Sequence, residues 1–485
     1  MHSTFVREQK RYTITNLCDK LQCSEETLIP IIRRLKEYGV LKAVRFNDQQ
    51  KDMSDLADAD IEVADVEIGE NEYLYVFTYV GITIVSGYVF KCYPKYLLTN
   101  QEPKDELCQI IKVLEKYNSE EQIIRMFNDT SESSSFNLLA VLFFLIRDYY
   151  ENGVYCNTED IIEINGSGEI LWDKTINETF TYLSNNRPYY PELLTRKRIN
   201  NDTDYFKRLH ECILTQTSRE MKNADLLDLF ETTEIDLSDE ELDDFGDKEY
   251  ILYRIEKELN TQFNTRKQLV LKTIYAYIDS RSNLSETNCI SMFGTNSFNL
   301  VWEKVCSKIL DNKLRCQLKD LSLPTKNVAP TYAPNDQLID IIEKPYWSIT
   351  GENAAETLIP DLITISGSQF LIFDAKYYTP KLEQNQKPKY QPGIESVTKQ
   401  YLYQLAYQPF IDAHGFTDVK NCFLMPTEKE EVENKGNVTM EMFQYLKYKN
   451  IEVKLKGIEV RYIPATVAYC YYLSGTTIDI NDLKL

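Results

Sequence analysis

The stretch Leu358–Tyr378, LIPDLITISGSQFLIFDAKYY, contains two apolar runs joined by Ser366, Gly367 and Ser368. Apolar, β-branched runs on both sides of such a turn predict a β-hairpin. Each run also carries an aspartate, Asp361 before the first run and Asp374 at the end of the second. In a hairpin closed at this turn the two aspartates lie beside each other. We therefore expect two carboxylates to meet at one edge of a sheet.

A lysine, Lys376, follows two residues after Asp374, and alternation along a strand places both side chains on the same face. Two carboxylates suit Mg²⁺ or Mn²⁺, which keeps several waters and also accepts phosphate oxygens. The backbone carbonyl of Ala375 is a further candidate ligand, and Lys376 would position a water or stabilise charge on a phosphate. The pattern indicates metal-assisted phosphodiester hydrolysis. A surface hairpin with an ordinary Asp–Lys ion pair explains the same residues equally well.

Two flanking segments add polar candidates to this edge. The segment 297–310, SFNLVWEKVCSKIL, has the apolar spacing of an amphipathic helix, and its Glu303 is a candidate metal or water ligand. The segment 395–410, ESVTKQYLYQLAYQPF, places Gln400 and Gln404 on one helix face, where they are candidates to orient a water or hold a phosphate. For Glu303 the competing reading is a solvent-facing helix glutamate.

The segment 13–44 predicts a helix, a tight turn, a second helix and a strand, the pattern of a winged helix-turn-helix. Arg33, Arg34 and Lys36 would lie on or beside the second helix, which enters the DNA major groove in such motifs. A small helical protein-interaction domain with a basic face fits the same segment equally well.

The length of 485 residues favours roughly three parts. We expect an α+β chain that begins with a winged helix-turn-helix-like module at 1–45 and a strand-rich module at 46–105. A mainly helical middle follows at 106–285, with an acidic linker at 231–249. A mixed sheet flanked by helices, carrying the candidate site, occupies 286–485.

The net charge is -21, yet it is unevenly distributed. Residues 231–249 hold ten acidic side chains and one lysine, whereas residues 1–45 hold nine basic and five acidic ones. Any contact with nucleic acid must therefore be local. The 11 cysteines lack the spacing of a zinc site or a disulfide framework, so we expect free thiols. The apolar run Phe136–Ile146 is too short to span a bilayer and no signal peptide opens the chain, so we expect a cytoplasmic protein without a membrane partner.

The order of these motifs resembles a known group of enzymes. A helix glutamate, P-D before a strand, D-A-K at a strand end and a glutamine-bearing helix is the order of the PD-(D/E)xK nuclease superfamily. Within it, the chain looks like the LlaJI-type restriction endonucleases, which are related to the nuclease subunit of McrBC-type systems. The motifs that carry the resemblance are VWEKV, PDLITI, FLIFDAKYY and KQYLYQLAY, with NGSGEILWDKTI and YVGITIVSGYVFKCYPKY further upstream.

The resemblance implies that the C-terminal part is a PD-(D/E)xK nuclease domain. It implies a DNA endonuclease subunit of a bacterial anti-phage restriction system that cuts double-stranded DNA with Mg²⁺. The sequence has no G-x-x-x-x-G-K-[S/T] motif, so a GTP-hydrolysing AAA+ motor, McrB-like, would be a separate subunit, with cognate DNA methyltransferases encoded nearby. The rival readings are another PD-(D/E)xK nuclease, in transposition or repair, and a catalytically silent DNA-binding regulatory subunit. The family's site falls on these residues: Glu303, Asp361, Asp374, Lys376 and, as a weaker match, Gln400.

Overall fold

The computed structural model describes residues 2–45, 73–117, 138–200, 204–284, 290–325, 332–382, 384–444, 447–448, 451–452 and 455–485. Helices and several sheets make up a mixed α/β fold. The chain forms two compact units, one of residues Glu132–Met292 and one that combines His2–Ser131 with Phe293–Leu485. The second unit thus joins two segments far apart in the sequence, which the predicted consecutive domains did not anticipate.

The core of the second unit is a five-stranded mixed sheet in the order β15-β16-β17-β21-β18. Antiparallel pairing joins β15 to β16 and β18 to β21, whereas β16, β17 and β21 run parallel. The central strands read as nearly continuous apolar runs because both faces of the sheet are covered. The strands are β15 (Leu362–Ser366), β16 (Gln369–Ala375), β17 (Asp418–Thr427), β18 (Glu433–Val438) and β21 (Ile458–Pro464).

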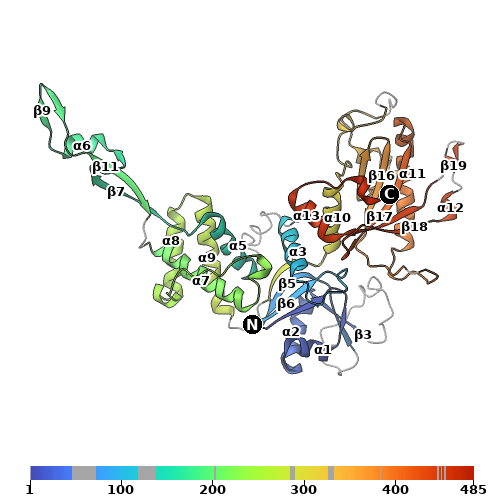
Figure 1. The fold of residues 1–485 in the computed structure, drawn as a ribbon, viewed down its shortest axis with the longest axis horizontal. Helices are drawn as coiled ribbons and strands as arrows, with labels where there is room; N and C mark the ends of the chain where they lie inside the picture. The colour runs from blue at the N-terminus through green and yellow to red at the C-terminus, as the bar shows by residue number, and fades with distance from the viewer. Residues whose placement is uncertain are drawn as a thin grey trace. The chain divides into compact units, whose positions relative to one another are not determined.

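Helices cover both faces of this sheet (Figure 1). The helices α10 (Phe298–Ile309) and α13 (Ala465–Ser474) lie on one side, and α11 (Ile394–His414), which connects β16 to β17, lies on the other. On the α11 side, Ile372 and Tyr407 belong to one hydrophobic cluster. The predicted C-terminal mixed sheet flanked by helices is therefore present. Smaller elements here are β13 (Tyr346–Trp347), β14 (Glu352–Asn353), α12 (Glu441–Gln444), β19 (Lys447–Tyr448) and β20 (Ile451–Glu452).

Near the N-terminus the structure has the predicted helix, turn, helix and strand. The helices are α1 (Ile14–Leu21) and α2 (Glu25–Glu37), and they are followed by β3 (Leu41–Arg45) and β4 (Tyr73–Phe77). Together with β2 (Arg11–Tyr12), the two strands form a sheet in the order β2-β4-β3. The buried positions of α2 recur with helical spacing, so this face packs inward as its sequence indicates.

A second N-terminal sheet has the order β1-β6-β5-β12. Its strands are β1 (His2–Arg7), β6 (Tyr88–Tyr93), β5 (Val80–Val85) and β12 (Ile290–Thr295). The approach of β12 to β5 requires a glycine, since a Cβ on Gly81 would lie 2.1 Å from a backbone oxygen of β12. Because β12 comes from the sequence that precedes α10, this sheet ties the N-terminal segment to the C-terminal one. The helix α3 (Lys104–Tyr117) follows β6 and packs against α13.

The other unit is built on four helices, α5 (Leu138–Asn152), α7 (Tyr205–Asn223), α8 (Lys248–Thr261) and α9 (Thr265–Leu284). The helix α9 packs against both α5 and α8, and α5 also packs against α7. No helix among the residues described here is long and apolar enough to cross a membrane.

The acidic segment 231–249 is bound to α7 and does not connect two separate bodies. Its Glu234 forms an ion pair with Lys222 of α7, with 2.5 Å between the carboxylate oxygen and Nζ. The side chains of Ile235 and Phe245 are buried. The acidic composition correctly indicated that most of the segment is exposed to solvent. Its buried residues Ile235 and Phe245 anchor it to the helical unit.

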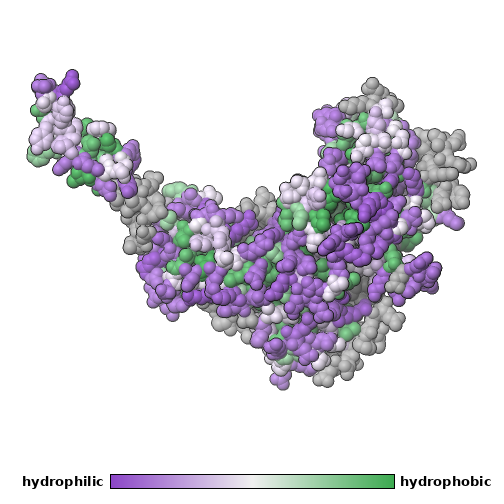
Figure 2. Space-filling model, viewed as in Figure 1, coloured by the Kyte–Doolittle hydropathy of each residue, from purple (hydrophilic) through white to green (hydrophobic). Residues whose placement is uncertain are grey.

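The middle of the chain also contains strands that the mainly helical prediction lacked. Residues 158–200, here called the arm, form an extended projection in which β7 pairs with β11 (Figure 1). Apolar and polar side chains are mixed on its surface (Figure 2). Its elements are β7 (Thr158–Ile164), β8 (Glu169–Ile170), α6 (Trp172–Glu178), β9 (Tyr182–Ser184), β10 (Arg187–Tyr189) and β11 (Leu194–Asn200).

Candidate active site

The β15–β16 hairpin brings the two predicted aspartates together. Leu362 pairs with Phe373, so Asp361 and Asp374 stand opposite each other one step beyond this pair. The Asp361 Oδ2 atom accepts a hydrogen bond from the backbone N–H of Ala375 at 2.9 Å. This bond fixes the Asp361 carboxylate at the end of β16.

A side chain that follows α10 holds the start of β15 in place. The Asn312 amide donates to the Asp361 carbonyl at 3.2 Å and accepts from the Ile363 N–H at 3.1 Å. Both backbone groups of an edge strand are thereby satisfied by one asparagine. The position of Asp361 consequently depends on where α10 ends.

Lys376 lies beside the second aspartate, as predicted. Its Nζ is 3.0 Å from Asp374 Oδ1, and the two side chains are 22% and 6% exposed. Burial lowers the pKa of Lys376, but the adjacent Asp374 and the nearby Asp361 outweigh burial and raise it above the ordinary lysine value. Lys376 therefore remains an ammonium at neutral pH and can donate hydrogen bonds to a substrate oxygen.

The negative charges of the two carboxylates repel each other. Burial raises the pKa of Asp361, and the negative charges of Asp374 and Glu303 raise it further, against a smaller lowering by the Ala375 N–H. Two carboxylates sharing a buried site disfavour double ionisation unless a cation joins them. Asp374 Oδ1 is buried. Among the described residues its partner is the Lys376 ammonium, which forms an ion pair with it at 3.0 Å.

The helix α10 presents Glu303 to this edge. Its neighbour Trp302 is fully buried and donates from the indole nitrogen to the Leu424 carbonyl of β17 at 3.1 Å. The pKa of the half-buried Glu303 lies above its ordinary value. Burial raises this pKa most, Lys376 lowers it, and Asp374 raises it further. Glu303 thus lies within electrostatic reach of the carboxylate pair, as the sequence predicted.

Gln400 has a different position from its predicted partners. It is fully buried in α11 and donates from Nε2 to the Ile372 carbonyl at 3.0 Å, two residues before Asp374. It therefore contacts the backbone of β16 and has no direct access to solvent in this structure. Its role as a water or phosphate ligand remains a prediction.

The predicted DNA-binding residues lie on α2, at Arg33, Arg34 and Lys36. Arg34 forms an ion pair with Glu37 at 3.4 Å, and Lys36 Nζ is buried. Their contact with DNA stays a prediction.

The carboxylate pair fits a divalent cation of the Mg²⁺ type. Within the ranges given above, no three histidine, cysteine, aspartate or glutamate side chains are arranged as a metal site. A cation here would take protein oxygens from Asp361 and Asp374 and complete its shell with water or substrate, as Mg²⁺ commonly does. The closeness of two buried carboxylates and the raised pKa of Asp361 agree with such a donor set. Glu303 and the Ala375 carbonyl remain predicted further ligands.

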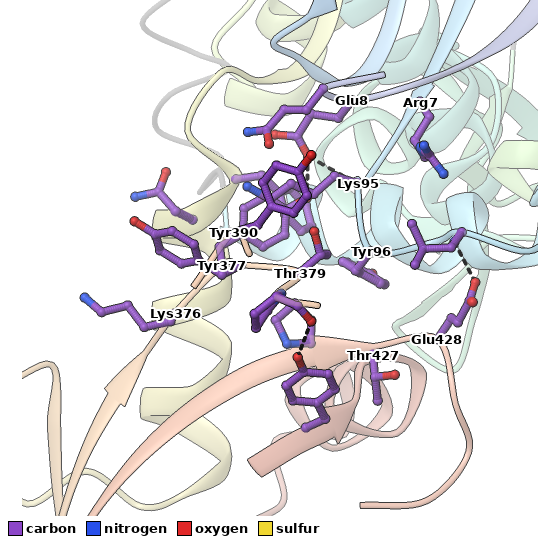
Figure 3. Close-up of a pocket in the computed structure, with 18 of the residues that line it drawn as sticks. Arg7, Glu8, Lys95, Tyr96, Lys376, Tyr377, Thr379, Tyr390, Thr427 and Glu428 are labelled. Atoms are coloured by element: carbon purple, nitrogen blue, oxygen red, sulfur yellow. Dashed lines mark hydrogen bonds between the residues drawn. The ribbon is translucent and has the colours of Figure 1, made fainter. Parts of the chain in front are cut away.

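The site opens into a cleft of ≈ 1080 Å³ that sequence reasoning did not find. Glu8, at the end of β1, accepts hydrogen bonds there from the Tyr377 hydroxyl and from the Lys95 N–H (Figure 3). The Lys95 ammonium lies 4.4 Å from the centre of the Tyr377 ring. No local sequence signal could reveal this contact, because Glu8 and Tyr377 are 369 positions apart.

Comparisons with known proteins identify the family of this chain. A model of the LlaJI restriction endonuclease family matches residues 79–329 and 331–463. The chain belongs to the LlaJI restriction endonuclease family. The "Type II restriction enzyme BsuMI component YdjA" of Bacillus subtilis (strain 168) is 26% identical over 425 residues, which is 84% of this chain and 83% of that protein.

Two solved assemblies from Thermococcus gammatolerans are also similar. One is a half-complex from a tetradecameric assembly of McrB AAA+ hexamers with bound McrC, with a TM-score of 0.38 and 11% identity over 98% of this chain and 99% of that one. The other is the McrBC complex, with a TM-score of 0.26 and 12% identity over 64% of this chain and 88% of that one. At these values neither assembly carries an inference about how this chain works.

Proposed function

We propose that this chain is the DNA-cleaving subunit of a type II-like restriction system and hydrolyses phosphodiester bonds of double-stranded DNA with Mg²⁺ or Mn²⁺. The observation that carries the proposal is the meeting of Asp361, Asp374 and Lys376 at the end of one hairpin, in a member of a restriction endonuclease family. A mixed sheet with helices on both faces supports the assignment of this region as a PD-(D/E)xK domain.

Each residue at this edge has a distinct proposed task. Asp361 and Asp374 hold the cation, which supplies Lewis acidity and lowers the pKa of a bound water. The Ala375 N–H orients the Asp361 carboxylate. Lys376, charged at neutral pH, donates to the attacking water or to the phosphate as negative charge grows there. Glu303 adds a carboxylate for a second metal contact or a water.

The direct test is cleavage of supercoiled plasmid by the purified chain, with and without a neighbour-encoded partner. We expect linear or nicked product with Mg²⁺ or Mn²⁺ and none in EDTA. Asp374→Ala should abolish cleavage, and calorimetry should show that it also loses Mn²⁺ binding. Lys456→Gln, at an exposed position on the far end of the sheet, is the matched control and should cut normally.

Two outcomes would contradict the proposal. Equal cleavage by the wild type and Asp374→Ala would show that the activity belongs to another site or a contaminant. Binding of DNA without cleavage under any partner and metal condition would favour the catalytically silent regulatory subunit.

We further propose that a separate subunit, an AAA+ GTPase of the McrB type, docks on the arm. Isolated exposed apolar residues are ordinary, but a concentration of them on one projection marks a protein-binding surface. Phe180 is 84% exposed and Leu183 is 77% exposed. Other exposed apolar residues of the arm are Ile162, Ile164, Trp172, Ile176, Tyr182 and Tyr189.

The partner is tested by co-purifying this chain with an ATPase or GTPase that a neighbouring gene encodes. Size-exclusion chromatography should show one complex for the wild type and separate peaks for Phe180→Asp/Leu183→Asp. A complex that survives the double change would place the interface elsewhere on the chain.

A further inference from the structure

The cleft beside the active site has a second wall that comes from the N-terminal segment. One wall carries Glu303 and Lys376. The other carries Arg7, Arg11 and Lys42, which belong to β1, β2 and β3. Figure 3 shows Arg7 and Lys376 among the residues that line this space. A ligand in the cleft would therefore touch the active site and the N-terminal strands together.

Strand register places two of these basic side chains on one face of the β2-β4-β3 sheet. Arg11 pairs with Val76 from one side, and Lys42 pairs with Val76 from the other. Paired residues on neighbouring strands point to the same face, so Arg11 and Lys42 flank Val76 two strand spacings apart, roughly 10 Å. Val44, two residues after Lys42, also lines the cleft. The sheet face, and no residue of α2 among those described, forms this wall.

The two walls are linked at one short contact. Glu8, adjacent to Arg7, accepts a hydrogen bond from the hydroxyl of Tyr377, adjacent to Lys376. Both Glu8 and Tyr377 are buried, so this contact is part of the packed interior. Arg7 and Lys376 are thus each one residue from the same bonded pair, which fixes the spacing between the walls.

The lining of the cleft is basic in a chain whose net charge is -21. Eight basic and four acidic side chains line it. Of the acids, Glu8 is buried and bonded to Tyr377, and Glu428 accepts from the backbone of Leu98 at 2.7 Å. Glu433 pairs with Lys429 at 2.6 Å. Glu433 also pairs with Lys435 at 3.2 Å, so two of the lining lysines are used in ion pairs. The lining as a whole keeps an excess of four basic over acidic side chains (8 − 4), which attracts phosphates.

We propose that the basic wall formed by Arg7 of β1, Arg11 of β2 and Lys42 of β3 holds the phosphate backbone of duplex DNA as it enters the active site. Arg7 lines the cleft and is partly exposed there, so its guanidinium can meet a phosphate. Lys42 is exposed, so it reaches a backbone without rearrangement. This assignment rests on the nuclease function proposed above and moves the main DNA contact from the helix α2 to the neighbouring strands.

The test measures binding separately from cutting. The full chain is titrated onto a fluorescein-labelled duplex of thirty or so base pairs in EDTA, and anisotropy is followed at several salt concentrations. For Arg7→Gln/Arg11→Gln/Lys42→Gln we expect at least tenfold weaker binding. The slope of log K against log salt should fall by about 2–3, because each lost phosphate contact contributes about 0.9.

A matched variant removes three exposed charges outside the cleft, as Lys104→Gln/Lys319→Gln/Lys456→Gln, and should change affinity less than threefold. A third variant, Arg33→Gln/Arg34→Gln/Lys36→Gln, tests the helix. A greater loss from the α2 variant than from the cleft variant overturns the proposal, as does equal loss from the cleft and matched variants.

Two further measurements keep the outcomes distinct. If the triple cleft variant fails to fold by circular dichroism, Lys42→Glu alone, at an exposed position, should weaken binding three- to tenfold, and an unchanged affinity overturns the proposal. If the wild type binds DNA through the cleft but never cuts it, the proposed nuclease function is contradicted and the proposed DNA contact is supported.

Discussion

The edge of the β15–β16 hairpin and the arm depart from the usual burial pattern in opposite directions. At the hairpin, Asp374 is 4% exposed although charged groups normally stay in water. On the arm, Phe180 is 84% exposed although aromatic rings normally leave water. Neither departure stabilises a free chain. Under the functions proposed above, a cation and a phosphate would compensate the first departure and an apolar protein surface the second.

The difference between them lies in what the ligand must do. The hairpin is embedded in a packed sheet, which holds its carboxylates in fixed positions as catalysis requires. The arm is a thin projection, which exposes apolar area without a rigid pocket. Substitutions at the two places should therefore affect chemistry and association separately.

The largest expected effect concerns the buried charge. Asp374→Asn should lower the rate of DNA cleavage at least 1000-fold, because a neutral amide holds a divalent cation far less well. The free energy of unfolding of the metal-free protein should change by no more than about 1 kcal/mol, because the substitution also relieves repulsion from Asp361. Plasmid cleavage and urea denaturation measure the two quantities. A large loss of stability would mean that the carboxylate pair is structural.

Next comes the exposed apolar surface. Phe180→Asp/Leu183→Asp should weaken binding of the partner subunit about 100-fold, since two large apolar contacts are replaced by charges. The free energy of unfolding should stay within about 0.5 kcal/mol of the wild type. Sedimentation velocity with the purified partner measures the affinity. Intact association with reduced stability would reverse the roles assigned to these residues.

A smaller effect should distinguish a buried tryptophan, Trp302, from an exposed one, Trp172. Trp302→Phe should cost about 1–2 kcal/mol of unfolding free energy, because a buried indole hydrogen bond is lost and a smaller ring fills the core less well, although the Leu424 carbonyl keeps the Lys376 N–H. The matched change Trp172→Phe on the arm, where the ring is 53% exposed, should cost less than about 0.5 kcal/mol. Urea denaturation of both variants provides the comparison, and equal costs would contradict the difference in burial.

The smallest effect is a pH dependence at Glu8. Burial raises the pKa of Glu8, with Lys95 and Tyr377 acting in the opposite direction. The folded chain then keeps a proton that the unfolded chain releases near pH 4.5, so this residue makes stability fall as pH rises above that value. Glu8→Gln should flatten the unfolding free energy between pH 5 and 8. The exposed Glu356→Gln is the control and should leave the curve unchanged.

Local pattern was sufficient for the hairpin. The Ser-Gly-Ser turn between two apolar runs predicted β15 and β16, and period-2 alternation predicted that Asp374 and Lys376 would lie together. The helical spacing of α10 left open whether Glu303 faces this edge or solvent, and in the structure it lies within electrostatic reach of Lys376 and Asp374. These features depend on residues within one or two neighbouring elements, where short-range rules hold.

Features that depend on distant pairing were not predictable. The joining of both ends of the chain in one unit requires β12 to pair with β5, which neither strand's sequence signals. Helix periodicity placed Gln400 and Gln404 on one face but could not tell that this face packs against the sheet. The strands β7 and β11 of the arm were missed because their alternating patterns are short and interrupted by charges.

The bond between Glu8 and Tyr377 also constrains the order of events during synthesis. A ribosome adding about 5–20 residues per second needs roughly 20–70 s to travel the 369 positions between them. Throughout that interval the nascent N-terminal strands lack the wall that completes their cleft. The two walls of the cleft can therefore meet only when nearly the whole polypeptide has been synthesised.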